Sequence, residues 1–141
     1  MKAPALILLA AACAGCAGQS EAPQQAELRT DHAYLVEWIG EQPLIDRSHL
    51  SLTLGSDGRA FGSGGCNHWF TRYELDGKSI RFGAMGSTRR ACAPALMEQE
   101  QRFFDALAQV RRWDFSELDQ LRLWPEQGAP VRLWSENYPD P

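Results

Sequence analysis

The sequence predicts an α+β fold in which a strongly curved antiparallel sheet, or partial β-barrel, packs on one amphipathic helix. Apolar runs separated by turn residues lie on both sides of a single helical segment at residues 95–110, where apolar side chains recur every three or four positions. Strands grouped in this way, rather than alternating with helices, are typical of antiparallel sheets. The chain has 141 residues, of which 44% are hydrophobic, enough for one such domain.

The strands expected before the helix begin with two short segments and a turn. Residues 34–39 are rich in β-formers and end at Gly40. Residues 49–54 alternate leucine with polar residues, which predicts a strand with one buried face. Ser-Asp-Gly at 56–58 is a turn signal, so residues 59–63 are expected to return as its partner strand.

A glycine-rich corner is expected next, because glycine tolerates backbone angles and close approaches that other residues do not. Its glycines are Gly62, Gly64 and Gly65. Strands at residues 69–75 and 78–82 then flank Asp76-Gly77, a pair that favours a type I′ turn. Residues 84–91 are expected to be irregular.

The helix is expected from residue 95 to about 110, after Pro94, which suits a first helical turn. Its apolar stripe comprises Leu96, Phe103, Leu107 and Val110. Glu100 interrupts this stripe. Further inward-facing strand residues are expected at Trp113, Phe115, Leu121, Leu123, Val131 and Leu133, with a turn at 117–120 and a last hairpin around Pro125 and Gly128.

The N-terminus has the pattern of a processed leader. The apolar run at residues 3–12 is far shorter than the roughly 20 residues that span a bilayer, so residues 1–15 are interpreted as a signal peptide. Ala14-Gly15-Cys16 resembles the lipobox of bacterial lipoproteins, which implies a lipidated Cys16 as the mature N-terminus. Cys13 is the alternative acylation site.

The lipoprotein resemblance also implies a location and a domain plan. No aspartate follows Cys16, which favours the outer membrane, on the side that faces the periplasm. Residues 16–30 are expected to form the lipidated N-terminus and a flexible tether, residues 31–136 the folded domain, and residues 137–141 a C-terminal tail.

The charge excludes some partners. Formal net charge is −4, whereas nucleic-acid-binding domains normally present a basic face. We therefore expect no nucleic acid partner. We also expect a monomer without metal or cofactor, attached to the membrane through its lipid.

Two motifs carry a resemblance to a family. The first is Gly64-Gly65-Cys66-Asn67, followed by Trp69-Phe70, and the second is Ser87-Thr88-Arg89 with Ala91-Cys92. Together they resemble the META domain of HslJ-like bacterial proteins, with Gly65, Cys66, Asn67, Thr88, Arg89 and Cys92 as the motif residues. Thr71 departs from a glycine that is frequent in the family.

This resemblance implies a compact META fold in an envelope protein. Some members are linked to heat shock and to novobiocin tolerance. The family has no established catalytic residues, so the resemblance supplies none. Its fold is similar to that of pilot lipoproteins that bind lipid and escort secretins to the outer membrane.

Cys66 and Cys92 remain after processing of the leader. Two thiols in an oxidising compartment normally form a disulfide, and closing a loop of this length stabilises a fold by roughly 3.5 kcal/mol on the chain-entropy model. Two alternatives remain open. The cysteines are reduced and buried, or they bind zinc together with His68, although the spacing lacks the paired cysteines of strong zinc motifs.

The remaining polar residues do not predict catalysis. A Ser-His or Cys-His site would need His32, His49 or His68 to be placed by the fold, and Glu98 and Glu100 are acids of the kind expected near a helix N-terminus.

A contact patch is expected at Asn67, Trp69 and Phe70 if these side chains are exposed. Asn67 has a second interpretation, in which its amide bonds the backbone of the turn.

The sequence therefore predicts a lipid-anchored, periplasm-facing META-domain protein that binds a partner or supports envelope integrity under stress, without turnover. The first alternative is a secretin-pilot-like lipoprotein that encloses an acyl chain or a peptide. The second is an envelope hydrolase.

Overall fold

The computed structural model describes Met1 and residues 26–138. The predicted acylation site Cys16, the rest of the leader from residue 2 and most of the tether lie outside the described residues, as do residues 139–141. The helix is α1 (Pro94–Gln109). The strands are β1 (Ala33–Ile39), β2 (Gln42–Pro43), β3 (Ser51–Leu54), β4 (Arg59–Ser63), β5 (His68–Asp76), β6 (Ser79–Phe82), β7 (Gly86–Ser87), β8 (Val110–Phe115), β9 (Leu121–Pro125) and β10 (Val131–Ser135).

The sheet is a closed antiparallel barrel. Neighbouring strands follow the order β1-β3-β4-β5-β6-β8-β9-β10, and β10 pairs with β1 to complete the circle. The short strands β2 and β7 pair with β1 and β5 at the margin. The predicted barrel is therefore confirmed, and it is closed rather than partial, because pairing between the first and last long strands leaves neither of them as an open edge.

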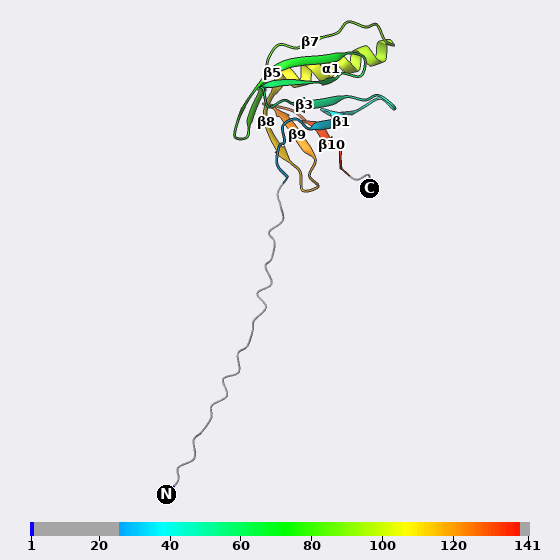
Figure 1. The fold of residues 1–141 in the computed structure, drawn as a ribbon. Coiled ribbons are helices and arrows are strands. Elements are labelled where there is room, and N and C mark those ends of the chain that lie inside the picture. The colour runs from blue at the N-terminus through cyan, green and yellow to red at the C-terminus, as the bar shows by residue number, and fades with distance from the viewer. Residues whose placement is uncertain (2–25, 139–141) are drawn as a thin grey trace.

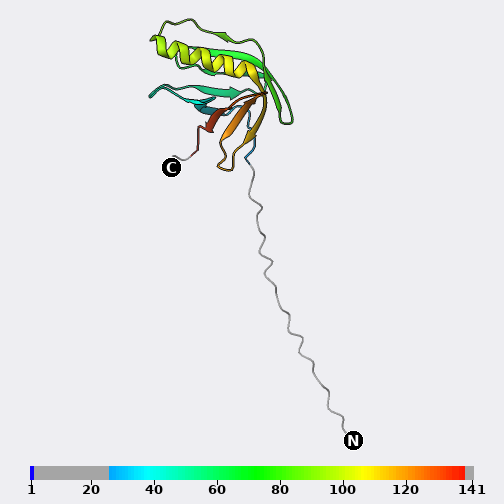
Figure 2. The ribbon, with the colours of Figure 1, turned by 180° about the vertical axis from the view of Figure 1, so that it is seen from behind.

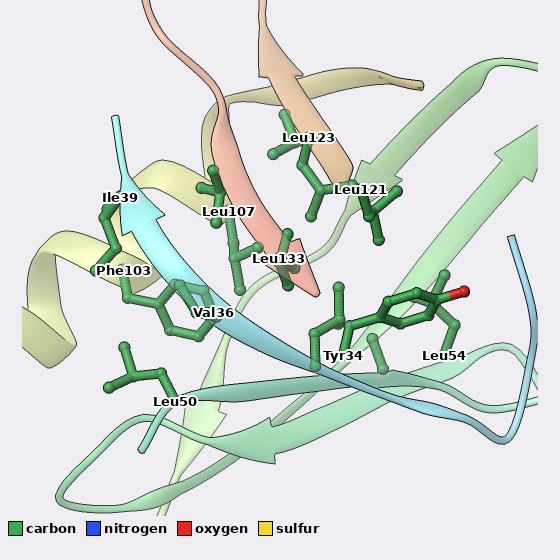
Figure 3. Packing of buried hydrophobic residues seen from close by; sticks show 14 of the residues in the cluster. Tyr34, Val36, Ile39, Leu50, Leu54, Phe103, Leu107, Leu121, Leu123 and Leu133 are labelled. Carbon is green, nitrogen blue, oxygen red and sulfur yellow. The ribbon is translucent and has the colours of Figure 1, made fainter. Parts of the chain in front are cut away.

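Helix α1 packs against β1, β6 and β9 and lies along one side of the strands (Figures 1 and 2). Phe103 and Leu107 project from the helix into the core, next to Val36 and Leu133 (Figure 3). The alternating pattern predicted for the strands is confirmed, since Leu50, Leu52, Leu54, Leu121, Leu123, Val131 and Leu133 are all buried. Hydrophobic burial of this single cluster is the main force that holds the helix on the barrel.

Three local predictions differ from the structure. Residues 84–91 are not wholly irregular, because β7 pairs with β5. The hairpin between β5 and β6 does not turn on Asp76-Gly77. Asp76 pairs with Ser79, so the loop is Gly77-Lys78, and only Gly77 has a positive φ, +56°. A positive φ at the first central residue alone is the pattern of a type II′ turn, not of type I′.

The folded part extends beyond the expected limits of residues 31–136. Leu28 packs against the core, and the Arg29 backbone N–H donates a hydrogen bond to the Tyr34 hydroxyl at 3.0 Å. At the other end, the Tyr138 ring lies 4.6 Å from that of Trp134. Among the described residues, no helix has the length and apolarity needed to cross a membrane.

Candidate functional site

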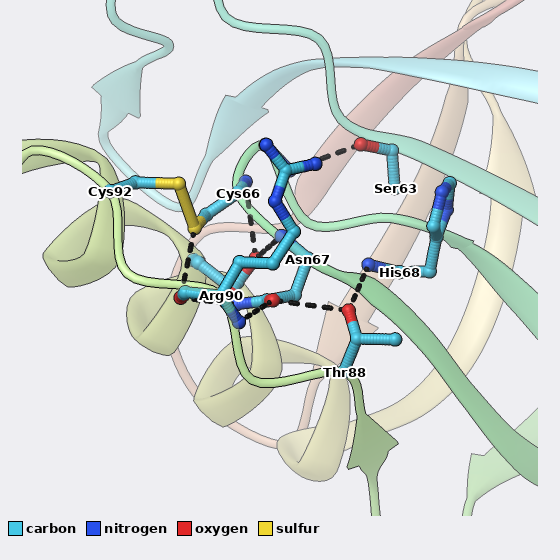
Figure 4. The surroundings of a disulfide bond; sticks show 9 residues. Ser63, Cys66, Asn67, His68, Thr88, Arg90 and Cys92 are labelled. Carbon is cyan, nitrogen blue, oxygen red and sulfur yellow. Dashed lines mark hydrogen bonds between the residues drawn. A yellow bond between two sulfur atoms is a disulfide. The ribbon is translucent and has the colours of Figure 1, made fainter.

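The two motif cysteines form a disulfide that joins the glycine corner after β4 to the loop before α1 (Figure 4). The Cα atoms of Cys66 and Cys92 lie 6.0 Å apart. This confirms the predicted disulfide. Because both sulfur atoms are committed to the bond, the alternatives of two reduced thiols and of a zinc site with His68 are wrong.

Glu100 lies at the centre of the corner and was missed as a site residue. Its carboxylate is buried and accepts hydrogen bonds from the backbone N–H groups of Cys66 at 3.2 Å and Asn67 at 2.6 Å. The side-chain amide of Asn67 donates a third, at 2.8 Å. Three N–H donors to one buried carboxylate make this a strong, charge-assisted link between helix and corner.

Asn67 extends this network to the second motif. Its side-chain oxygen accepts from the Thr88 hydroxyl at 3.0 Å and from the Arg90 backbone N–H at 2.6 Å (Figure 4). The Thr88 hydroxyl oxygen also accepts from the backbone N–H of His68 at 3.1 Å. The interpretation that Asn67 bonds turn backbone therefore fits the structure. Hydrogen bonds from Asn67 thus connect the first motif to the second, and together the two motifs stabilise one corner of the fold.

The corner glycines are needed where the backbone passes close to other groups. Gly65 has φ +98°, in the region that glycine alone adopts readily. At Gly64 an added Cβ would collide with the Glu100 carboxylate, and at Gly62 it would collide with the backbone carbonyl of Ser51. The glycines thus allow the helix carboxylate to reach the backbone of the corner.

The predicted contact patch is wrong for two of its three residues. Trp69 is 1% exposed and packs against Phe103, and Asn67 is 8% exposed. Only Phe70 faces solvent, at 57% exposure, opposite the exposed Phe61 of β4. The motif residue Arg89 is also exposed. Strand alternation separates Trp69 from Phe70, since successive side chains point to opposite faces of a sheet.

Gln99 is a second buried polar residue of α1 that the sequence interpretation missed. Its side-chain oxygen accepts from the Ile45 backbone N–H at 2.7 Å, and its amide donates to the Ser48 hydroxyl at 2.9 Å. It therefore holds the loop between β2 and β3.

The sequence contains a signal for Glu100. This residue is three positions before Phe103 on the buried stripe of the helix, where a polar side chain needs hydrogen-bond partners.

The histidines are placed by the fold in different ways. The His32 ring nitrogen Nε2 lies 2.7 Å from the Ser135 hydroxyl, and the Arg29 guanidinium donates to the same nitrogen at 2.9 Å. Burial lowers the pKa of His32, and the positive charge of Arg29 lowers it further. His49 and His68 have exposed side chains. The contacts of His32 connect the segment before β1 to the end of β10.

Asp114 accepts hydrogen bonds from two neighbouring side chains on the outer face of the barrel. Arg122 donates two hydrogen bonds to its carboxylate, at 2.7 and 2.9 Å, and the Trp124 indole donates one at 2.8 Å. The Arg112 guanidinium lies 4.6 Å from the centre of the Trp124 ring. Burial alone would raise the pKa of Asp114, but the bonds from Arg122 and Trp124 and the charges of both arginines outweigh it, so the pKa is lowered.

A cleft of about 450 Å³ opens between α1 and the loop joining β9 to β10. Arg102 and Gln109 line it from the helix, and Glu126 and Gln127 line it from the loop. Its apolar lining comprises Ile39, Ala106, Leu123, Pro125, Ala129 and Val131. The Nε atom of Arg102 is buried and has no hydrogen-bond partner among residues 26–138. The cleft therefore combines an apolar surface with the positive charge of Arg102.

Comparison with known proteins identifies the fold and the family. The family model described as META domain matches residues 26–138. The fold is similar to that of an NMR structure of a protein from Burkholderia xenovorans, with 24% identity, a TM-score of 0.63 and coverage of 77% of this chain and 84% of that one. A second NMR structure has 21% identity, a TM-score of 0.57 and coverage of 73% and 87%. No curated protein matches. The chain belongs to the META-domain family.

Proposed function

We propose that this chain is a lipid-anchored envelope protein, attached through Cys16 to the outer membrane on its periplasmic side, which binds a partner or supports envelope integrity under stress. The observation that carries the proposal is the Cys66–Cys92 disulfide. Structural disulfides persist in oxidising compartments such as the periplasm and are rare in the cytosol. The leader at residues 1–15, with its lipobox-like end, provides a route to that compartment.

We further propose that the protein acts without turnover. The motif residue Asn67 forms its hydrogen bonds with Thr88 and Glu100, and the disulfide removes both motif thiols as nucleophiles. An envelope hydrolase would need another site. Ser135 and His32 are within hydrogen-bonding distance, but Arg29 donates to the same His32 nitrogen that would have to accept the serine proton. Among residues 26–138, no carboxylate hydrogen-bonds to His32 to orient it as a triad requires.

The cleft beside α1 favours a second candidate function, a carrier of a small ligand or peptide. Pilot-like enclosure of an acyl chain inside the barrel is less compatible with this structure, because Leu52, Phe103, Leu107 and Leu133 are fully buried there against one another. The cleft lies outside this core, between the helix and the loop after β9. A ligand would therefore bind at the side of the barrel.

Metabolic labelling with an alkyne analogue of palmitate tests the anchor. The wild-type chain and the Cys13→Ala variant should incorporate the label and sediment with outer membranes, whereas Cys16→Ala should do neither. Loss of label in Cys13→Ala alone would move the anchor to Cys13. An unlabelled wild-type protein that remains soluble would contradict the proposal.

A further inference from the structure

We propose that the cleft between α1 and the loop joining β9 to β10 binds a carboxylate attached to a small aliphatic group and followed by an amide. An N-acyl amino acid has this chemistry, and so does the C-terminal residue of a peptide. The inference specifies a ligand class for the binding role proposed above and rests on that role. The volume of the cleft, about 450 Å³, lies within the range of small-ligand sites.

Arg102 supplies the contact for the carboxylate. Its Nε atom is buried without a hydrogen-bond partner, a condition found for no other buried side-chain nitrogen or oxygen in the part of the chain that the structure describes. Within the same part, no carboxylate lies within ion-pairing distance of Arg102. An anion in the cleft would accept hydrogen bonds from the two terminal nitrogens of the Arg102 guanidinium, because the buried Nε atom cannot be reached from the cleft. The planar guanidinium matches a carboxylate with two parallel hydrogen bonds.

The floor of the cleft suits a short aliphatic group. Ile39, Leu123 and Val131 line it from three neighbouring strands of the barrel, and each is almost fully buried. Ala106 lines it from the helix, one turn after Arg102, so the apolar surface begins next to the guanidinium. Carboxylate and aliphatic group are therefore expected on adjacent atoms of the ligand.

The polar rim distinguishes among anions. Glu126 lines the same cleft, so a doubly charged phosphate would be repelled there more strongly than a singly charged carboxylate. Gln109 and Gln127 add two side-chain amides, each able to donate to and accept from a ligand amide. One cation, one anion and two amides favour a singly charged ligand that carries an amide.

Titration of the full chain, followed by NMR, tests the inference. N-acetyl-L-leucine should shift the methyl resonances of Ala106, Leu123 and Val131, with a dissociation constant on the order of 1 mM. N-acetyl-L-leucinamide should bind about tenfold or more weakly, because it lacks the anion. A tripeptide ending in leucine with a free carboxylate separates the two sources, since tighter binding than N-acetyl-L-leucine indicates a peptide ligand.

Arg102→Gln should weaken the binding of N-acetyl-L-leucine about tenfold or more. The control Arg72→Gln, on the exposed surface of β5, should leave this binding unchanged. Equal binding of acid and amide by the wild-type protein would overturn the inference without any variant. Tighter binding of inorganic phosphate than of N-acetyl-L-leucine would also overturn it. If the acid does not bind as predicted but the chain is acylated at Cys16, the ligand inference fails and the proposed envelope role stands. If the acid binds as predicted but the chain is not acylated, the ligand inference stands and the proposed anchor fails.

Discussion

The carboxylate of Glu100 stabilises the corner that the two motifs form, so its loss should lower the free energy of unfolding of the protein. Glu100→Gln replaces one acceptor oxygen by an NH₂ group that faces N–H donors, so the free energy of unfolding should fall by about 2 kcal/mol. Urea denaturation measures the change. The matched control is Glu98→Gln, on the exposed side of the same helix, which should change stability by less than about 0.5 kcal/mol. Equal effects of the two variants would contradict the role of Glu100.

Asp114 gives an acid-side prediction. Its pKa is lower in the folded protein than the ordinary value of 3.8, so the unfolded chain binds the proton more tightly. The stabilisation is fully present above that value and is lost as the pH falls through the folded pKa. The stability of Asp114→Asn should therefore decline less than that of the wild type between pH 5 and 2, both measured by thermal unfolding. Asp46→Asn, an exposed control, should follow the wild type.

His32 gives a prediction nearer neutrality. Its pKa is lowered from 6.5 in the folded state, so folding favours the neutral ring. As the pH falls below 6.5, the unfolded chain binds a proton that the folded chain resists, and stability decreases. His32→Gln should remove this slope between pH 7 and 5.5, and His49→Gln, at an exposed position, should retain it. An unchanged slope in His32→Gln would contradict the burial of His32 beside Arg29.

At the scale of elements, the disulfide ties the loop before α1 to the corner after β4. The double variant Cys66→Ala/Cys92→Ala should lose roughly 3.5 kcal/mol, as expected for a loop closed across a sequence separation of 26 residues. A reducing agent should destabilise the wild type by a similar amount and the double variant not at all. Sensitivity of the double variant to reduction would show that another thiol pair contributes.

The sequence predicts elements well where periodicity is strong. Helix α1 begins one residue before its predicted start, and the alternating leucines of β3 are buried as expected. Barrel closure was not predictable, because it depends on register between β1 and β10, which are almost a hundred residues apart in the chain. For Glu100, the buried stripe indicates a polar residue that needs partners, but its partners at Cys66 and Asn67 are identified only once the fold brings the corner beside the helix.

The site was predictable only in part for the same reason. Cys66 and Cys92 could be paired because they are the two cysteines that remain after processing and the expected compartment is oxidising, whereas the exposure of Phe70 and the burial of Trp69 depend on which face of β5 the core occupies. The cleft has no sequence signature. Arg102 and Glu126 come together only when α1 packs beside the loop after β9.

At the scale of the whole molecule, we propose a membrane anchor at Cys16 joined to a domain that one disulfide stabilises. In this proposal the leader and Cys16 bring the domain to the periplasm, where the cleft beside α1 would face ligands. A soluble variant with Cys16→Ala and an intact leader should fold with the same thermal stability as the detergent-extracted wild type, because the core lies within residues 26–138. A loss of folding in that variant, seen by circular dichroism, would show that the lipid contributes to the fold.

Intact-mass spectrometry of the protein extracted from membranes tests the central claim most directly. We predict a chain that begins at Cys16, carries diacylglyceryl and further acyl mass, and is about two hydrogen masses lighter than the reduced form because of the bond between Cys66 and Cys92. An unprocessed chain starting at Met1, or a processed chain with two free thiols, would contradict it.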